Sequence, residues 1–227
     1  MAFTKVTEII KEEPAYAALT DLAAERLGGK VLYATDDFFA EKENLIKPGR
    51  GIFITDKYTD RGKWMDGWES RRKRTPGHDW AVIQLAAPGK ITGFDIDTNF
   101  FLGNHPPHAS VEALYLPEGT ESIDWTNEHL GWKEILPKSP LDPGSRNFYA
   151  CADAAVYSHL RLHIYPDGGV ARFRVYGHVF KDWNLVSEST EIDLAAAIEG
   201  AQAIACNDMF FSAMSNLIMP GRGVNMG

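Results

Sequence analysis

An internal repeat limits the folds that this chain can adopt. Residues 21–51 (DLAAERLGGKVLYATDDFFAEKENLIKPGRG) align without a gap to residues 193–223 (DLAAAIEGAQAIACNDMFFSAMSNLIMPGRG), at a separation of 172 residues and with 15 identities in 31 positions. A repeat unit of about 170 residues is too long for a solenoid and has the size of a domain. The sequence therefore predicts two copies of a domain-sized fold.

The second copy begins near residue 191 and is cut short by the end of the sequence at Gly227. We expect residues 1–19 to form an N-terminal lead, residues 20–190 the first copy, and residues 191–227 the incomplete start of the second. A piece shorter than about 40 residues rarely folds alone, so the last segment is expected to dock on the first copy or to stay mobile. The repeat suggests a fragment of a two-repeat protein of about 340 residues.

The first copy is predicted to be mainly β-structure. Residues 80–85 (WAVIQL) form a continuous apolar run typical of a buried strand, residues 91–97 (ITGFDID) alternate in polarity, and residues 110–116 (SVEALYL) suggest a third strand. Residues 159–177 alternate on both sides of a Pro-Asp-Gly-Gly turn, which predicts a β-hairpin.

Helical signals are few, and we expect short helices only at residues 4–12, 16–27 and 192–199. Short strands joined by Gly- and Pro-rich loops, without a βαβ rhythm, indicate an all-β fold, a β-sandwich or jelly roll. Loops gather at the two ends of such a sandwich and usually carry its function.

Charge and hydropathy exclude several classes of protein. The formal net charge is −8 and the pI about 5.4, which disfavours general nucleic-acid binding because that needs a broad basic face. The N-terminus has no apolar region typical of a signal peptide, and no apolar run approaches the length of a membrane span. We therefore expect a cytoplasmic protein with no membrane or nucleic-acid partner.

The segment 64-WMDGWESRRKR-74 is the first candidate site. Asp66 and Glu69 precede four consecutive cations, Arg71 to Arg74, and tryptophans that include Trp68 could wall a pocket. A basic island on an acidic protein suits a small carboxylate, which arginine grips with two parallel hydrogen bonds. The alternative is a solvated loop whose charges pair with one another.

Further candidates follow along the chain. His78 stands at the entrance of the 80–85 strand and could act as a general acid or base. Asn104 and His105 could bind substrate, although prolines that rigidify the loop explain them equally well. Asp95 and Asp97 face the same side of a strand and are weak candidates for a hard cation; we expect at least one of them to be displayed at the surface.

Five long blocks of the sequence resemble the allantoicase family. They are LGGKVLYATDDFF (27–39), GKWMDGWESRRKRTPGHDW (62–80), DIDTNFFLGNHPPHASVEA (95–113), RLHIYPDGGVARFRVYG (161–177) and CNDMFFSAMSNLIMPGR (206–222). The resemblance covers the chain from about residue 20 onward. It implies tandem repeats, each a jelly-roll sandwich similar to galactose-binding-like domains, and it implies hydrolysis of allantoate to (S)-ureidoglycolate and urea in purine and allantoin degradation.

Allantoate is a carboxylate that carries two ureido groups on one carbon. Under this resemblance we expect Arg71 and Arg72 to bind the carboxylate, Asp66 and Glu69 to hold ureido N–H groups or to move protons, and His78 to act as acid or base. Asn104, His105 and Trp68 are expected to complete the pocket. Some family members are associated with a divalent metal such as Mn²⁺, and a homo-oligomer is expected.

A second hypothesis assumes the same fold without catalytic activity. The sandwich loops would then form a non-catalytic module that binds a carbohydrate or a small anion, since the fold alone does not decide function. Loss of activity on removing His78 or Glu69 would separate a hydrolase from a binder.

Overall fold

The computed structural model describes residues 12–117, 119–120 and 123–223. In these residues all helices are short 3₁₀ helices, and the rest of the regular structure is β-strand. The 3₁₀ turns are η1 (Ala15–Ala18), η2 (Glu25–Leu27), η3 (Lys42–Ile46), η4 (Glu128–Leu130), η5 (Trp183–Leu185), η6 (Ala197–Glu199) and η7 (Met214–Ile218). The helices expected at 16–27 and 192–199 are thus reduced to short 3₁₀ turns, while most of 4–12 lies outside the described residues.

Twelve strands make up the described β-structure. They are β1 (Thr20–Asp21), β2 (Lys30–Ala34), β3 (Tyr58–Thr59), β4 (Gly62–Lys63), β5 (Trp68–Glu69), β6 (Asp79–Asp97), β7 (His108–Leu114), β8 (Lys133–Pro140), β9 (Arg146–Ala150), β10 (Val156–Tyr165), β11 (Gly169–Val170) and β12 (Arg172–Val179). All pairings between them are antiparallel.

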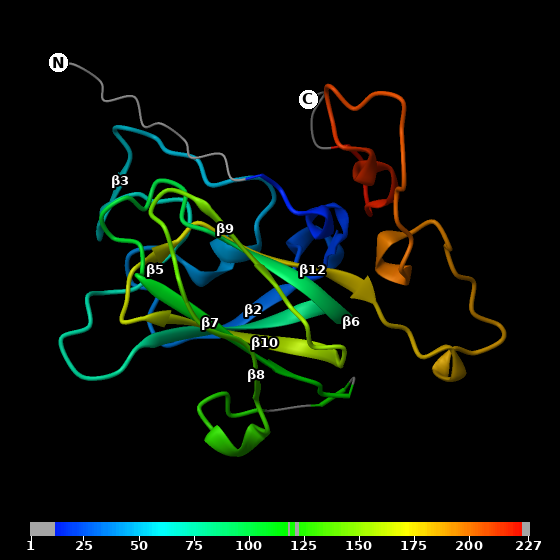
Figure 1. Ribbon diagram of the computed structural model, residues 1–227, viewed down its shortest axis with the longest axis horizontal. Helices are drawn as coiled ribbons and strands as arrows, with labels where there is room; N and C mark the ends of the chain where they lie inside the picture. The colour runs from blue at the N-terminus through cyan, green and yellow to red at the C-terminus, as the bar shows by residue number, and fades with distance from the viewer. Residues whose placement is uncertain (1–11, 118, 121–122, 224–227) are drawn as a thin grey trace.

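The long strand β6 joins the two layers of the sandwich. Its first half, residues 79–84, pairs with β2 and β10, and β10 continues through β7 to β8. Its second half, residues 89–97, pairs with β12 and β9, and β12 pairs with β1. In Figure 1 β9 and β12 lie above β7, β10 and β8, and the register places the second half of β6 between β9 and β12. The all-β jelly-roll sandwich is confirmed.

Pro88 and Gly89 lie where β6 changes partners. A Cβ atom on Gly89 would meet Leu22 Cδ1 at 2.6 Å and the carbonyl oxygen of His178 at 2.8 Å, so a side chain would collide with β12 and with the residue that follows β1. Glycine therefore allows these residues to approach β6 closely at this point. The sequence predicts the two halves, 80–85 and 91–97, but not that they are one strand.

The hairpin predicted for residues 159–177 is wrong. Both strands form, as β10 and β12, but they do not pair with each other because β6 lies between them. The Pro-Asp-Gly-Gly turn instead connects the two layers, and its last glycine begins β11, which pairs with β5.

One hydrophobic core fills the space between the layers. On β10, Leu160, Leu162 and Ile164 point into it, and on β12 Phe173 and Val175 do so. The alternate residues of each strand lie on the outer faces, as the twofold period of a strand requires. The outer faces carry buried polar residues that include His159 and His163 on β10 and Arg172 on β12.

The start of the second copy repeats the local structure of the first. The turns η6 and η7 lie 172 residues after η2 and η3, residue for residue. Gly28 and Gly200 both end their turns with a left-handed backbone, at φ values of 108° and 98°. In Figure 1 this segment, coloured orange to red, lies beside the sandwich.

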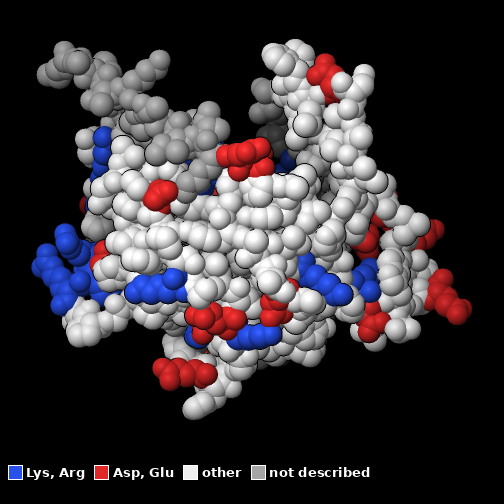
Figure 2. Space-filling model, viewed as in Figure 1, with Lys and Arg blue, Asp and Glu red and all other residues white. Residues whose placement is uncertain are grey.

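Charges are mixed over the described surface. Figure 2 shows Lys and Arg side chains gathered at the left edge of the visible face and otherwise interspersed with Asp and Glu. The described part of that face therefore has no broad basic surface. No helix of the described residues is long and apolar enough to cross a membrane.

Candidate functional site

A pocket of about 400 Å³ opens among the loops at one end of the sandwich, around Glu69. The backbone of Glu69 is held on both sides. Its N–H donates to the carbonyl of Ala40 at 3.0 Å, and β5 pairs it with Gly169 of β11. Two separate segments therefore fix this carboxylate, although it lies in a loop region.

Glu69 contacts Asn104 across the pocket. The Asn104 side-chain amide donates to Glu69 Oε1 at 2.6 Å, and the Asn104 carbonyl accepts from the N–H of Gly169 at 2.8 Å. Burial raises the pKa of the Glu69 carboxyl above its usual range, and the hydrogen bond from Asn104 offsets part of that rise. A half-buried carboxyl with a raised pKa is suited to proton transfer.

Aromatic rings form one wall of the pocket. Phe53 and Phe100 stack with their ring centroids 5.5 Å apart and their planes at 24°. Phe100 has a φ of 65°, a left-handed backbone that is uncommon for a bulky residue and that concentrates at functional sites. The wall offers an apolar surface to a flat ligand.

Two cations complete the pocket, Arg61 and Lys63. Arg61 donates from Nη1 to the carbonyl of Phe38 at 2.9 Å, and the Lys63 ammonium lies 4.5 Å from the ring centroid of Phe53. Both side chains are exposed, so they can reach an anionic group beside Glu69. Sequence reasoning missed both, because it followed the longer Arg71–Arg74 run; the only signal was their position just before Trp64.

Trp68 and Asp66, both predicted to contact substrate, are structural. Trp68 is fully buried in the core and donates from Nε1 to the carbonyl of Asp36 at 2.8 Å. Asp66 accepts from Arg172 Nη2 at 2.8 Å and from the N–H of Ile52 at 2.9 Å. Because of this burial and these hydrogen bonds, neither side chain lines the pocket.

Three further predicted residues, Arg71, Arg72 and His105, do not line the pocket. Arg71 pairs with Asp36: its Nε donates a hydrogen bond to Asp36 Oδ2 at 2.6 Å. Arg72 is exposed. His105 is half-buried, and its Nδ1 is buried without a hydrogen-bond partner among the described residues. The structure thus brings Glu69 and Asn104 together and leaves Arg71, Arg72 and His105 outside.

His78 belongs to a separate polar cluster on the outer face of β10. Its Nε2 lies 2.8 Å from Nδ1 of His163, and His163 Nε2 lies 2.8 Å from Glu112 Oε2. Arg161 Nε also donates to Glu112, at 2.7 Å. Burial and then the neighbouring His163 lower the pKa of His78.

The contribution of Glu112 to this cluster can be tested by measuring how the stability of the fold changes at acid pH. The His163 hydrogen bond lowers the pKa of Glu112 from 4.5 to about 2. A carboxyl whose pKa is lower in the folded state than in the unfolded state stabilises the fold at pH values above the unfolded-state pKa. That stabilisation is lost as the pH falls from about 4.5 to about 2. We expect Glu112→Gln to lower the free energy of unfolding at pH 7 by about 1 kcal/mol, allowing for solvent screening.

Urea denaturation of both forms at pH 7, 5, 4 and 3 measures this difference. The gap between wild type and Glu112→Gln should shrink as the pH falls. A gap that stays constant down to pH 3 would contradict the assignment of the low pKa to Glu112.

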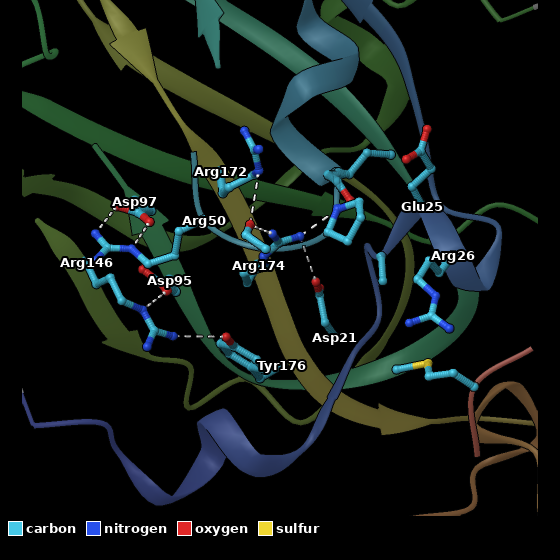
Figure 3. A pocket seen from close by; sticks show the side chains of 15 residues that line it. Asp21, Glu25, Arg26, Arg50, Asp95, Asp97, Arg146, Arg172, Arg174 and Tyr176 are labelled. Carbon is cyan, nitrogen blue, oxygen red and sulfur yellow. Dashed lines mark hydrogen bonds and ion pairs between the residues drawn. The ribbon is translucent and has the colours of Figure 1, made fainter. Parts of the chain in front are cut away.

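A second pocket, of about 330 Å³, lies on the outer face of β6, β9 and β12 (Figure 3). Asp95 and Asp97 line it and are each only 2% exposed, so the expected surface display of one of them is wrong. Asp97 is paired with Arg50, and Asp95 with Arg146.

This arrangement does not fit a metal ion. The two carboxylates already accept hydrogen bonds from guanidinium groups, and further arginines, Arg172 and Arg174, line the same pocket and would repel a cation. Within the described residues, no group of three or more His, Cys, Asp or Glu side chains could hold a metal. We therefore derive no catalytic step through Mn²⁺.

The fold is an all-β jelly-roll sandwich with a pocket among the loops at one of its ends. The model of the allantoicase repeat matches residues 20–180. The chain belongs to the allantoicase family. The resemblance stated from the sequence blocks is thereby confirmed.

Two curated relatives and one solved structure agree with this. The chain is 51% identical to Probable allantoicase 1 of Burkholderia mallei over 91% of its own length and 60% of the relative. It is 48% identical to Probable allantoicase of Pseudomonas fluorescens over 93% of its length and 62% of the relative. A crystal structure of allantoicase from Saccharomyces cerevisiae superposes with a TM-score of 0.76 at 37% identity, over 91% of this chain and 61% of that one. The chain thus spans about three fifths of the proteins it matches.

Proposed function

We propose that the chain binds allantoate in the Glu69 pocket and hydrolyses it to ureidoglycolate and urea. The observation that carries the proposal is the half-buried Glu69 carboxyl, with its raised pKa, held 2.6 Å from the Asn104 amide in a pocket that two cations also line. Membership of the allantoicase family supports the choice of substrate.

Each part of allantoate has a counterpart in the pocket. Arg61 and Lys63 bind the carboxylate, since both side chains are exposed and line the pocket. The Asn104 amide donates to a ureido carbonyl, and the stacked rings of Phe53 and Phe100 cover the flat ureido group. In this proposal Arg61 and Lys63 bind the substrate carboxylate, and Arg71 and Arg72, which the sequence suggested for that role, do not.

The reaction exchanges one C–N bond for one C–O bond at the central carbon. Protonated Glu69 donates its proton to the ureido nitrogen as the C–N bond breaks, so that urea leaves as a neutral molecule. A water molecule adds its oxygen to the central carbon and returns a proton to Glu69. Positioning of substrate and acid in one pocket supplies the proximity that the step needs.

Urea release from allantoate by the 227-residue chain tests the proposal, with and without added Mn²⁺, together with allantoate binding by calorimetry. Turnover with saturable binding is expected. Allantoate binding without turnover favours the second candidate, a non-catalytic small-anion module. A folded chain that neither binds nor hydrolyses allantoate would contradict the assignment of this pocket. We further propose a cytoplasmic location and a homo-oligomeric assembly.

A further inference from the structure

A third pocket, of about 730 Å³, lies at the end of the sandwich away from Glu69, and we call it the Trp125 pocket. His159 at the start of β10 and Val179 at the end of β12 line it. Glu69, in contrast, pairs with β11, which follows the end of β10 and precedes the start of β12. The two pockets share no lining residue among those described, so they are separate sites.

Segments far apart in the sequence build the Trp125 pocket. The middle of β6 contributes Leu85 and Pro88, and the connection between β7 and β8 contributes Trp125. Ile198 comes from η6, in the second copy of the repeat. Most of the described lining residues are apolar. A mainly apolar cavity of about 300–1,000 Å³ is typical of a site for a small organic molecule.

The described lining of the Trp125 pocket offers no unpaired charge. Its charged side chains are Lys181 and Glu199, and these form an ion pair with each other. Burial lowers the pKa of His159 to about 4, so this imidazole is neutral at pH 7. An ionic ligand would lose its hydration here without gaining a partner of opposite charge, and the pocket therefore favours an uncharged molecule.

His159 has one ring nitrogen without a partner. The side chain is only 8% exposed, and its Nδ1 lies 2.9 Å from Ser158 Oγ. Its Nε2 makes no hydrogen bond within the described part of the chain, although the residue lines the pocket. Buried polar groups in proteins nearly always have a hydrogen-bond partner. A polar atom of a molecule bound in the pocket would supply the one that Nε2 lacks.

The indole ring of Trp125 narrows the class of ligand. Its centroid lies 5.4 Å from the centroid of the His159 ring, and the two ring planes are tilted by 30°. Both rings line the pocket. Aromatic rings attract one another in offset and tilted arrangements at such distances, so a planar aromatic ligand gains more from this wall than a saturated one.

We propose that the Trp125 pocket binds a small, uncharged aromatic molecule, which packs against Trp125 and forms a hydrogen bond with Nε2 of His159. A heteroaromatic ring with both an N–H group and a bare ring nitrogen suits either tautomer of His159. If Nδ1 donates to Ser158, Nε2 accepts from the ligand, and if Ser158 donates to Nδ1, Nε2 donates to it. The proposal goes beyond the proposed hydrolysis and does not depend on it.

Calorimetric titration of the 227-residue chain with benzimidazole at pH 7.5, where this probe is uncharged, tests the site. We expect saturable binding with one molecule per chain. Benzoate, an aromatic anion, should bind about tenfold more weakly, since the described lining offers it no free cation. Phe100→Ala, which removes an aromatic wall of the Glu69 pocket, should leave the Kd for benzimidazole unchanged.

His159→Phe keeps a planar ring and removes both ring nitrogens. Indene, the hydrocarbon with the shape of benzimidazole, serves as the reference ligand. The ratio of the Kd for indene to the Kd for benzimidazole should fall about fivefold in His159→Phe, the loss expected for one hydrogen bond. Trp125→Leu, in a connecting loop, should raise the Kd for benzimidazole about fivefold and keeps the test valid if His159→Phe does not fold. Trp183→Leu is the matched control, because this tryptophan is 53% exposed and does not line the pocket.

Three results would overturn the proposal: no saturable binding of benzimidazole by the folded chain, binding that is lost in Phe100→Ala, or a Kd that Trp125→Leu leaves unchanged. Benzoate binding as tightly as benzimidazole would overturn the assignment to uncharged ligands. An unchanged ratio of the two Kd values in His159→Phe would contradict the hydrogen bond to His159. Urea release from allantoate is scored separately, so this proposal and the proposed hydrolysis can fail independently.

Discussion

Replacing Glu69 with glutamine is expected to lower kcat for urea release from allantoate by about 10²- to 10⁴-fold, the range for removal of a general acid. Glutamine keeps the size of the side chain and can still accept the hydrogen bond that Asn104 donates at 2.6 Å. The loss would therefore report the missing proton and not a rearranged pocket. Initial rates at saturating allantoate measure it.

The pH profile adds a second readout. Glu69 must be protonated to act as the acid, so kcat should fall as the pH rises through its pKa, which burial places above the usual range. Glu69→Gln should flatten this limb, whereas Glu134→Gln, an exposed carboxylate on β8, should leave kcat and its pH dependence unchanged. An unchanged kcat in Glu69→Gln would remove Glu69 from the reaction and leave the binding module as the better reading.

Leu45→Ala is expected to lower the free energy of unfolding by about 2–5 kcal/mol, while the same change at its repeat partner Leu217 should cost less than about 0.5 kcal/mol. Leu45 in η3 is fully buried, whereas Leu217 in η7 is 88% exposed. Both leucines lie in the sequence Asn-Leu-Ile and in the same kind of 3₁₀ turn. The local effect of the substitution is therefore the same at both positions, and the two variants differ in the burial of the leucine.

Chemical denaturation of the two single variants gives both values from the shift in the unfolding midpoint. Equal losses at Leu45 and Leu217 would contradict the difference in burial. They would mean that the second-copy segment is packed in solution as firmly as the first.

Pattern reasoning predicted the strands well and their pairing poorly. The runs at 80–85 and 91–97 and the alternation around residues 159–177 all mark true strands. Alternation reports only which side of a strand is apolar, and it carries no information about the neighbouring strand. The hairpin between β10 and β12 was therefore wrong, because β6 separates them.

The same limit applies to the sites. Glu69 and Asn104 were both named from the sequence, but their contact depends on β5 and β11 pairing across about a hundred residues of chain. Trp68 was expected in the pocket and is instead fully buried in the core. A residue type shows what chemistry is possible, and only packing shows whether solvent or substrate can reach it.

The two copies of the repeat show most clearly what the sequence determines and what the tertiary structure determines. The sequence by itself determined the family, the all-β class and the local turns: η2 and η6 recur with the same left-handed glycine, and so do η3 and η7, because backbone preferences act over a few residues. Only the tertiary structure decided what those turns bury. Leu22 and Leu45 lie in the core, while Leu194 and Leu217 are 74% and 88% exposed. Burial depends on strands distant in sequence, and the described part of the second copy has no sheet of its own to pack against.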